Sequence, residues 1–356
     1  MRTGIANLPL HWGKAPPWLF NLMRRLARQI TEACVEEFGP QEFLRKISSP
    51  FWFQALGAVL GFDWHSSGLT TTVCAALKEG IKGIEKDIGI FIAGGKGRIS
   101  RKTPEEIDRY GKFIEIDPNK LIYASRMAAK VDSAGLQDGY TLYHHAFFFT
   151  VDGSWAVVQQ GMNEQTRYAR RYHWLGEALD DFVCEPHNAI CAEKVHNKVL
   201  NMVALDSEQA RNMSTILARE KPDKVIKEIS KLDSLTLPRR HPILLADIDR
   251  KRLRKILIET YERQPENFET LLSMRGVGAK TIRALSLVSE LIYGKQPSFK
   301  DPARFSFAHG GKDGHPYPVD KSNYESTIEV LERAISLAKI GNKEKLAAIR
   351  RLHNKL

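Results

Sequence analysis

The chain has 356 residues, of which 43% are hydrophobic and 27% charged, a composition typical of a folded globular protein. It has no apolar run long enough to span a membrane, no secretory leader pattern and only four scattered cysteines, so we expect a cytoplasmic protein without a disulfide framework. Lysine and arginine outnumber aspartate and glutamate by 53 to 42, and this excess favours a polyanionic partner such as nucleic acid over the mixed charged surface of a thermophilic protein.

The first half of the chain predicts helices followed by strands. Apolar residues recur at helical spacing over residues 18–30, 51–62 and 70–80. The apolar run 88–93 predicts a buried strand, and Thr103 followed by a proline and two glutamates predicts a helix start with Thr103 as the N-cap. Two apolar stretches around Asp152-Gly153 form the strongest β-hairpin signal in the chain.

Helical patterns return after about residue 189 and continue to the end of the sequence, apart from a stretch rich in glycine and proline between residues 294 and 318. Prolines near residues 236–242 suggest a boundary. The sequence therefore predicts an α+β protein: a mixed α/β module over residues 1–235, expected to be catalytic, and an all-helical module over residues 236–356.

A Gly-Val-Gly sequence lies between two predicted helices near residues 265–274 and 279–293. The glycines allow a tight turn and a close backbone approach, and the amide groups that begin the second helix favour an anion. This motif resembles the helix-hairpin-helix family of DNA-binding modules. The resemblance implies contacts to the DNA backbone from Gly276, Val277, Gly278, Lys280 and Thr281.

The same hairpin also resembles that of bifunctional DNA glycosylases, which reads Gly-Val-Gly-x-Lys-Thr and is followed by a Val-Asp pair. That resemblance implies Lys280 as a Schiff-base amine and Asp320 as the assisting carboxylate. Two features depart from the family: forty residues separate Lys280 from Asp320, and Lys321-Ser322 replaces the usual Thr-His.

Across about residues 1–205 the chain resembles a family of archaeal and thermophilic bacterial proteins catalogued as a domain of unknown function. The resemblance rests on six sequence segments: residues 8–13, 50–57, 61–68, 143–145, 159–162 and 169–174. The resemblance brings no known activity.

Several of these segments, and the residues next to them, are rich in polar side chains that are not expected in a hydrophobic core. Asp, His and Lys side chains that converge at strand ends can bind a divalent cation, Mg²⁺ or Mn²⁺, and activate water for phosphodiester cleavage. The candidates for such a site are Asp63, His65, Lys130, Asp132, Asp138, His144 and His145. Adjacent histidines on a strand point to opposite faces, so only one of His144 and His145 readily enters a given site. The alternative is a set of buried polar groups that satisfy one another.

Two further stretches suggest contacts with ligands. Arg170 and Arg171 lie among aromatic residues, which suits phosphate contact with base stacking but equally an exposed helix anchored by Trp174. Cys184, His187, Cys191 and His196 suggest zinc, although their continuous spacing is more typical of an ordinary helix.

The leading hypothesis from the sequence is a DNA-binding, DNA-processing enzyme of repair or recombination, acting as a metal-dependent nuclease. The alternatives are a glycosylase or abasic-site lyase that uses Lys280 and Asp320, and a DNA-binding adaptor without catalysis.

Overall fold

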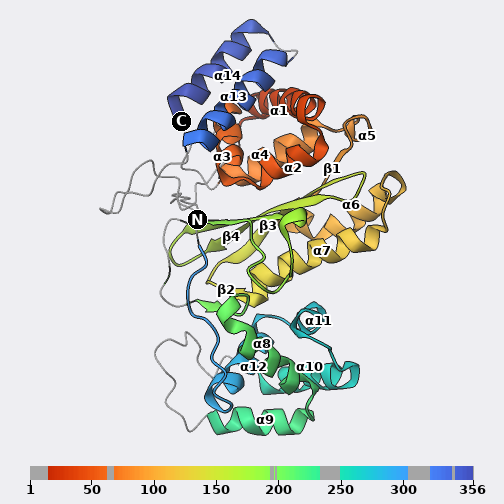
Figure 1. Ribbon diagram of the computed structural model, residues 1–356, viewed down its shortest axis with the longest axis vertical. Coiled ribbons are helices and arrows are strands. Elements are labelled where there is room, and N and C mark those ends of the chain that lie inside the picture. The colour runs from red at the N-terminus through yellow and green to blue at the C-terminus, as the bar shows by residue number, and fades with distance from the viewer. Residues whose placement is uncertain are drawn as a thin grey trace.

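The computed structural model describes residues 15–61, 68–192, 196, 199–232, 249–303, 321–338 and 341–355, and it is elongated with three layers (Figure 1). An upper helical layer lies above a sheet layer, and a lower helical layer lies on the other side of the sheet. The upper helical layer contains α1 (Pro17–Phe38), α2 (Pro40–Ser48), α3 (Pro50–Val59), α4 (Gly68–Gly80), α13 (Lys321–Leu337) and α14 (Asn342–Lys355). The chain is thus a mixed α+β protein, as expected.

The sheet layer is built on five antiparallel strands in the order β1-β3-β4-β5-β6. These strands are β1 (Ile90–Lys96), β3 (Thr141–Thr150), β4 (Trp155–Asn163), β5 (Tyr168–Leu175) and β6 (Ala189–Cys191). The predicted hairpin is confirmed: β3 and β4 pair around the Asp152-Gly153 turn, where Thr150 and Ser154 close the turn with a 3.0 Å backbone hydrogen bond. Gly153 has φ +84°, a left-handed conformation that favours glycine.

Both faces of this sheet are buried, because alternate side chains of each strand point to opposite sides. Phe91, Phe147 and Phe149 belong to the core shared with α6 (Thr103–Tyr110) and α7 (Pro118–Lys130). Ile92 and Phe148 belong to the core shared with the upper helical layer. A polar side chain on either face must therefore find its hydrogen-bond partners inside the protein.

The lower helical layer follows the sheet in the chain. It contains α8 (Glu208–Arg219), α9 (Pro222–Lys231), α10 (Arg250–Arg263), α11 (Phe268–Ser273) and α12 (Ala279–Leu291). Helix α8 packs on α10, α11 and α12, while α13 and α14 return to pack on α1 and α3. The helices after residue 235 therefore do not pack as one module. Helices α10 to α12 belong to the lower helical layer, and α13 and α14 belong to the upper one.

A connecting segment joins the sheet layer to the lower helical layer. It consists of a π-helical turn (Val131–Gly135) after α7 and the short strand β2 (Leu136–Gln137), which pairs with β7 (Leu200–Asn201). The minor elements are α5 (Glu85–Ile88) and short turns at Gly97–Lys102, Gly111–Phe113, Gly176–Ala178 and Leu205–Ser207. No helix among the described residues is long and apolar enough to cross a membrane.

Three local expectations were wrong. Residues 168–175 form strand β5 inside the sheet, not an exposed helix. The stretch that contains Cys191 forms strand β6, not a helix. Helix α6 begins with Lys102 at the N-cap position, and the Thr103 hydroxyl donates to the carbonyl of Ser100 at 2.7 Å instead of capping the helix.

Candidate functional site

The turn between α11 and α12 contains two glycines in different conformations. Gly276 has φ +88°, a left-handed conformation that disfavours other residues. Val277 is only 1% exposed and packs into the core of the lower helical layer, and Thr281 is 3% exposed, so the side chains of these two expected DNA contacts are buried. Gly278 has φ −145°, and a Cβ atom added there would meet no atom within 4 Å. The backbone conformation therefore favours a glycine at position 276, but no contact within the chain requires a glycine at position 278.

Lys130, a candidate for the catalytic site, instead holds this turn in place. Its Nζ atom donates to the carbonyl of Met274 at 2.9 Å and to the carbonyl of Val277. Burial lowers the pKa of Lys130. The Gln137 amide donates to the carbonyl of Ala279 at 3.0 Å, so the end of α7 holds the turn and the connecting segment holds the start of α12.

Amide groups and basic side chains face outward at the same place. The first amides of α12 have no acceptor within the helix, and the N-cap residue is Gly278, which has no side chain to accept from them. Arg275 and Lys280 are exposed. Ile256 of α10 lies 3.6 Å from the position of a Cβ atom on Gly276, so the middle of α10 contacts the turn, with the exposed Lys255 next to Ile256 and the exposed Arg252 one turn earlier.

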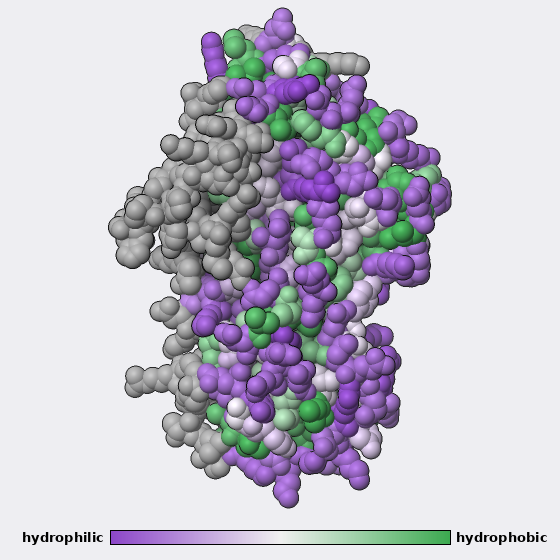
Figure 2. Space-filling model, viewed as in Figure 1, coloured by the Kyte–Doolittle hydropathy of each residue, from purple (hydrophilic) through white to green (hydrophobic). Residues whose placement is uncertain are grey.

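We call the following residues the hairpin surface: Arg252, Lys255, Arg275, Gly276, Gly278 and Lys280. All four of its basic side chains are exposed. The face of the lower helical layer seen in Figure 2 is largely hydrophilic, with a few hydrophobic patches. This surface offers backbone amides and positive charge together, which is the chemistry of a phosphate site.

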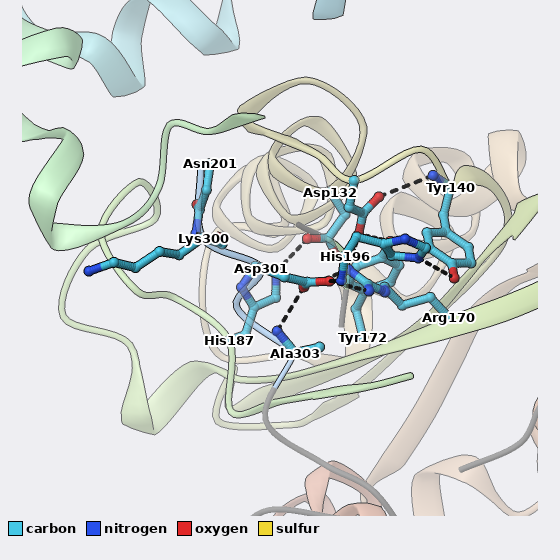
Figure 3. A network of polar contacts seen from close by, with 11 residues as sticks. Asp132, Tyr140, Arg170, Tyr172, His187, His196, Asn201, Lys300, Asp301 and Ala303 are labelled. Atoms are coloured by element: carbon cyan, nitrogen blue, oxygen red, sulfur yellow. Dashed lines mark hydrogen bonds and ion pairs between the residues drawn. The ribbon is translucent and has the colours of Figure 1, made fainter. Parts of the chain in front are cut away.

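A second polar cluster lies inside the sheet layer, centred on Arg170 (Figure 3). The Arg170 guanidinium contacts Asp138 at 2.9 Å and Asp301 at 2.7 Å, and all three side chains are at most 1% exposed. Tyr172 donates to Asp138 at 2.7 Å, and the backbone amide of His196 donates to Asp301 at 2.7 Å. Burial raises the pKa of Asp138, and the positive charge of Arg170 opposes that rise.

Arg170 and Arg171 are therefore not contacts for DNA, because both are 0% exposed. Arg171 points to the opposite face of β5, where it donates to His173 at 2.8 Å and to Gln54 at 3.1 Å. The pattern of arginines and aromatics that suggested a nucleic-acid surface is instead that of a strand whose buried arginines hydrogen-bond inside the protein.

A third cluster surrounds Asp132, which is 0% exposed. Its Oδ2 atom accepts from Gln159 at 2.6 Å and from Trp174 at 2.9 Å, and its Oδ1 atom bonds to His187. The carbonyl oxygen of the Gln159 side chain bonds to His145 at 2.7 Å. The structure thus brings two predicted site residues, Asp132 and His145, close together, with the Gln159 amide between them.

The two adjacent histidines lie on opposite faces of β3, as expected from strand geometry. His145 bonds to Gln159 and, at 2.9 Å, to Ser125. His144 faces the upper helical layer, and neither of its ring nitrogens has a hydrogen-bond partner among the described residues. Burial lowers the pKa of His144 to about 3 and that of His145 to about 4.

Three candidates, Asp63, His65 and Asp320, lie outside the described residues. Among the residues that are described, which include Cys184, His187, Cys191 and His196, no group of three or more His, Cys, Asp or Glu is placed to hold a metal ion. The described residues therefore do not provide the ligands for the expected Mg²⁺ or Mn²⁺ site.

His187 was missed as a site residue. Its side chain is 7% exposed, bonds to Asp132 and packs edge-on against Trp174 with ring centroids 4.7 Å apart. In the sequence it was noticed only for its spacing from cysteines. Its partner Asp132 is far away in the chain, so no local pattern marks the pair.

A family model described as "Protein of unknown function (DUF763)" matches residues 4–319. No curated protein and no solved structure matches the chain.

Proposed function

The chain belongs to the DUF763 family of proteins of unknown function, and we propose that it binds DNA by the sugar-phosphate backbone through the hairpin surface. The observation that carries this proposal is Gly278, a glycine with an ordinary φ and open space where a side chain would lie. A glycine without an internal cause, in a turn that Lys130 holds rigid, is explained by a ligand that approaches the backbone closely.

A phosphate group fits this arrangement. The amides at the start of α12 and the positive end of its dipole attract an anion, and Lys280 in the first turn adds a full charge. Such contacts position a protein on nucleic acid without reading its sequence. The resemblance of the turn to helix-hairpin-helix modules favours DNA as the polyanion.

The first test compares the two glycines. Gly278→Ala is expected to lower the free energy of unfolding by at most about 1 kcal/mol, because the added methyl meets nothing in the chain and alanine is only a poorer N-cap than glycine. It is expected to lower DNA affinity about tenfold, because the methyl meets the backbone of the ligand. Gly276→Ala is expected to destabilise the protein by about 1–2 kcal/mol, because φ is +88° there. Urea unfolding and fluorescence anisotropy with a labelled duplex measure the two effects. Unchanged affinity in Gly278→Ala would refute the close approach.

The second test removes a charge. Lys280→Ala is expected to weaken binding to all DNA sequences to a similar extent and to reduce the slope of log K against log salt by about one. The matched control is Lys82→Ala, because Lys82 is 74% exposed but follows α4 on the other side of the sheet. Equal salt slopes for Lys280→Ala and the wild type would contradict a phosphate contact at this position.

We further propose that the bound DNA is processed, with phosphodiester hydrolysis as the first candidate reaction. End-labelled single-stranded, duplex, junction and abasic-site DNA, each incubated with Mg²⁺, with Mn²⁺ and with chelator, test this. Cleavage that chelator abolishes supports a metal-dependent nuclease. Cleavage of abasic DNA alone, with a borohydride-trapped adduct that Lys280→Ala removes, supports the lyase. Binding without cleavage supports the adaptor.

A further inference from the structure

A cavity of about 280 Å³ lies between α1, the end of α3 and α14 in the upper helical layer (Figure 1). Its apolar walls are Leu19, Leu22 and Leu26 of α1, Leu60 at the end of α3 and Ala347 of α14. At about 30 Å³ for each water-sized group, the cavity has room for a ligand of about ten non-hydrogen atoms. Voids inside a packed protein are rarely larger than one water molecule, so a hollow of this size is a candidate ligand site.

The apolar lining of the cavity continues onto the surface. Leu22 is 40% exposed, and Trp18, which lies four residues earlier on the same face of α1, is 65% exposed. Apolar side chains that gather at the mouth of a cavity favour a ligand with an apolar body.

Arg351 brings a positive charge to the cavity. Its Nε atom donates to the carbonyl of Val59 at 3.0 Å, which holds the guanidinium against the end of α3. Its two terminal nitrogens have no hydrogen bond to the described residues. Burial lowers the pKa of Arg351, and no carboxylate of the described residues lies close enough to oppose this effect.

The other two charged residues of the lining largely satisfy each other. Arg25 lies 4.0 Å from one oxygen of Glu344, and the other oxygen of Glu344 accepts from the amide of Gly341 at 3.2 Å. The lining has two arginines and one glutamate, so one positive charge is left in excess. A guanidinium that is held through Nε presents its remaining N–H groups as a planar fork, and this fork matches the two oxygens of a carboxylate.

We infer that this cavity binds a small amphiphilic anion, an aliphatic carboxylate of about eight carbons, with its chain against the leucines and its carboxylate on Arg351. A carboxylate of this length has about ten non-hydrogen atoms, which is the size that the cavity accepts. The inference is independent of the proposed DNA binding, because the cavity lies in the upper helical layer and the hairpin surface in the lower one. The bound molecule joins α1, α3 and α14, so it stabilises the docking of the last helix.

The experiment titrates the full chain by calorimetry with octanoate, octanol and octylammonium, which share a chain length and differ in the charge of the head group. The variants are Arg351→Met, Arg351→Lys and Ala347→Phe, which fills the cavity. The matched control is Arg28→Met, because Arg28 is a partly buried arginine of α1 that pairs with Glu32 and does not line the cavity. Urea unfolding identifies any variant that fails to fold.

We expect octanoate to bind the wild type at one site with a Kd below about 1 mM. Octanol and octylammonium are expected to bind at least tenfold more weakly, because neither offers a negative charge to Arg351. Arg351→Met is expected to weaken octanoate at least tenfold and to leave octanol within about twofold of the wild type. Arg351→Lys keeps the charge but not the fork, so its affinity for octanoate is expected to lie between those of the wild type and Arg351→Met.

Ala347→Phe is expected to weaken octanoate and octanol alike, and Arg28→Met to behave as the wild type. Three results would overturn the inference: no saturable binding of octanoate up to about 10 mM, equal affinities for octanoate and octylammonium, or full octanoate affinity in folded Arg351→Met. If Arg351→Met fails to fold, Ala347→Phe decides, because unchanged octanoate binding in that variant would place the ligand outside the cavity.

Discussion

Replacement of Arg170 by methionine is expected to lower the free energy of unfolding by about 3–5 kcal/mol. The guanidinium lies between the carboxylates of Asp138 and Asp301, and none of the three side chains is more than 1% exposed. Without Arg170, two negative charges remain buried with no cation between them. Urea unfolding at neutral pH measures the loss, and a loss below about 1 kcal/mol would contradict the electrostatic role of the cluster.

Two comparisons separate charge from packing. Arg45→Met removes an arginine that also contacts a carboxylate through two nitrogens, Glu177 at 2.7 Å, but the pair is exposed, so a loss of at most about 1 kcal/mol is expected. The triple variant Arg170→Met, Asp138→Asn, Asp301→Asn removes the charges together. It is expected to recover part of the stability, because buried ion pairs can be replaced by neutral groups at little cost.

Acid is expected to destabilise the protein strongly between pH 7 and pH 5. The folded-state pKa is about 3 for His144 and about 4 for His145, compared with 6.5 for an unperturbed histidine, and burial also lowers the pKa of His173 well below that value. The folded state therefore binds fewer protons than the unfolded state in this range. The stability is complete above pH 6.5 and falls as the pH falls toward the folded pKa values. His144 and His145 each contribute about 2 kcal/mol between pH 7 and pH 5, or about 4 kcal/mol together, and His173 adds to the loss in the same direction.

Unfolding midpoints in urea at pH 7, 6 and 5 test this expectation. His145→Gln cannot gain a proton, so it should reduce the loss between pH 7 and pH 5 by about 2 kcal/mol relative to the wild type. A stability that is constant over this range would show that the histidines take up protons in the folded protein.

The sequence predicted those parts of the fold that depend on local signals. The β3–β4 pair was predictable because Asp152-Gly153 provides a tight turn between two apolar stretches. Strand β5 was not, because Arg170 and Arg171 are polar on both of its faces. Their burial depends on Asp138, Asp301 and Gln54, which are distant in the sequence and adjacent only in the folded chain.

The candidate site also has a part that the sequence predicted and a part that it did not. The turn around Gly276 and Val277 was predictable from its local pattern, since backbone conformation and a short apolar framework determine it. The positions of Lys130 and Asp132 were not. Both were expected at one catalytic centre, but Lys130, the last residue of α7, binds the turn, and Asp132, in the π-helical turn that follows, binds His187.

The return of the chain to the upper helical layer has a consequence for its synthesis. Leu331, Ile335 and Leu352 are buried in the same core as α1 to α4, and Arg351 donates to the carbonyl of Val59 at 3.0 Å. Helices α1 to α4 are therefore synthesised long before α13 and α14, which cover part of their apolar surface. A nascent chain with such exposed surface is a substrate for chaperones, and contacts between distant ends of a sequence slow folding. We therefore expect the folding of the upper helical layer to be completed only when α13 and α14 are present, more than 200 residues after the helices that they cover.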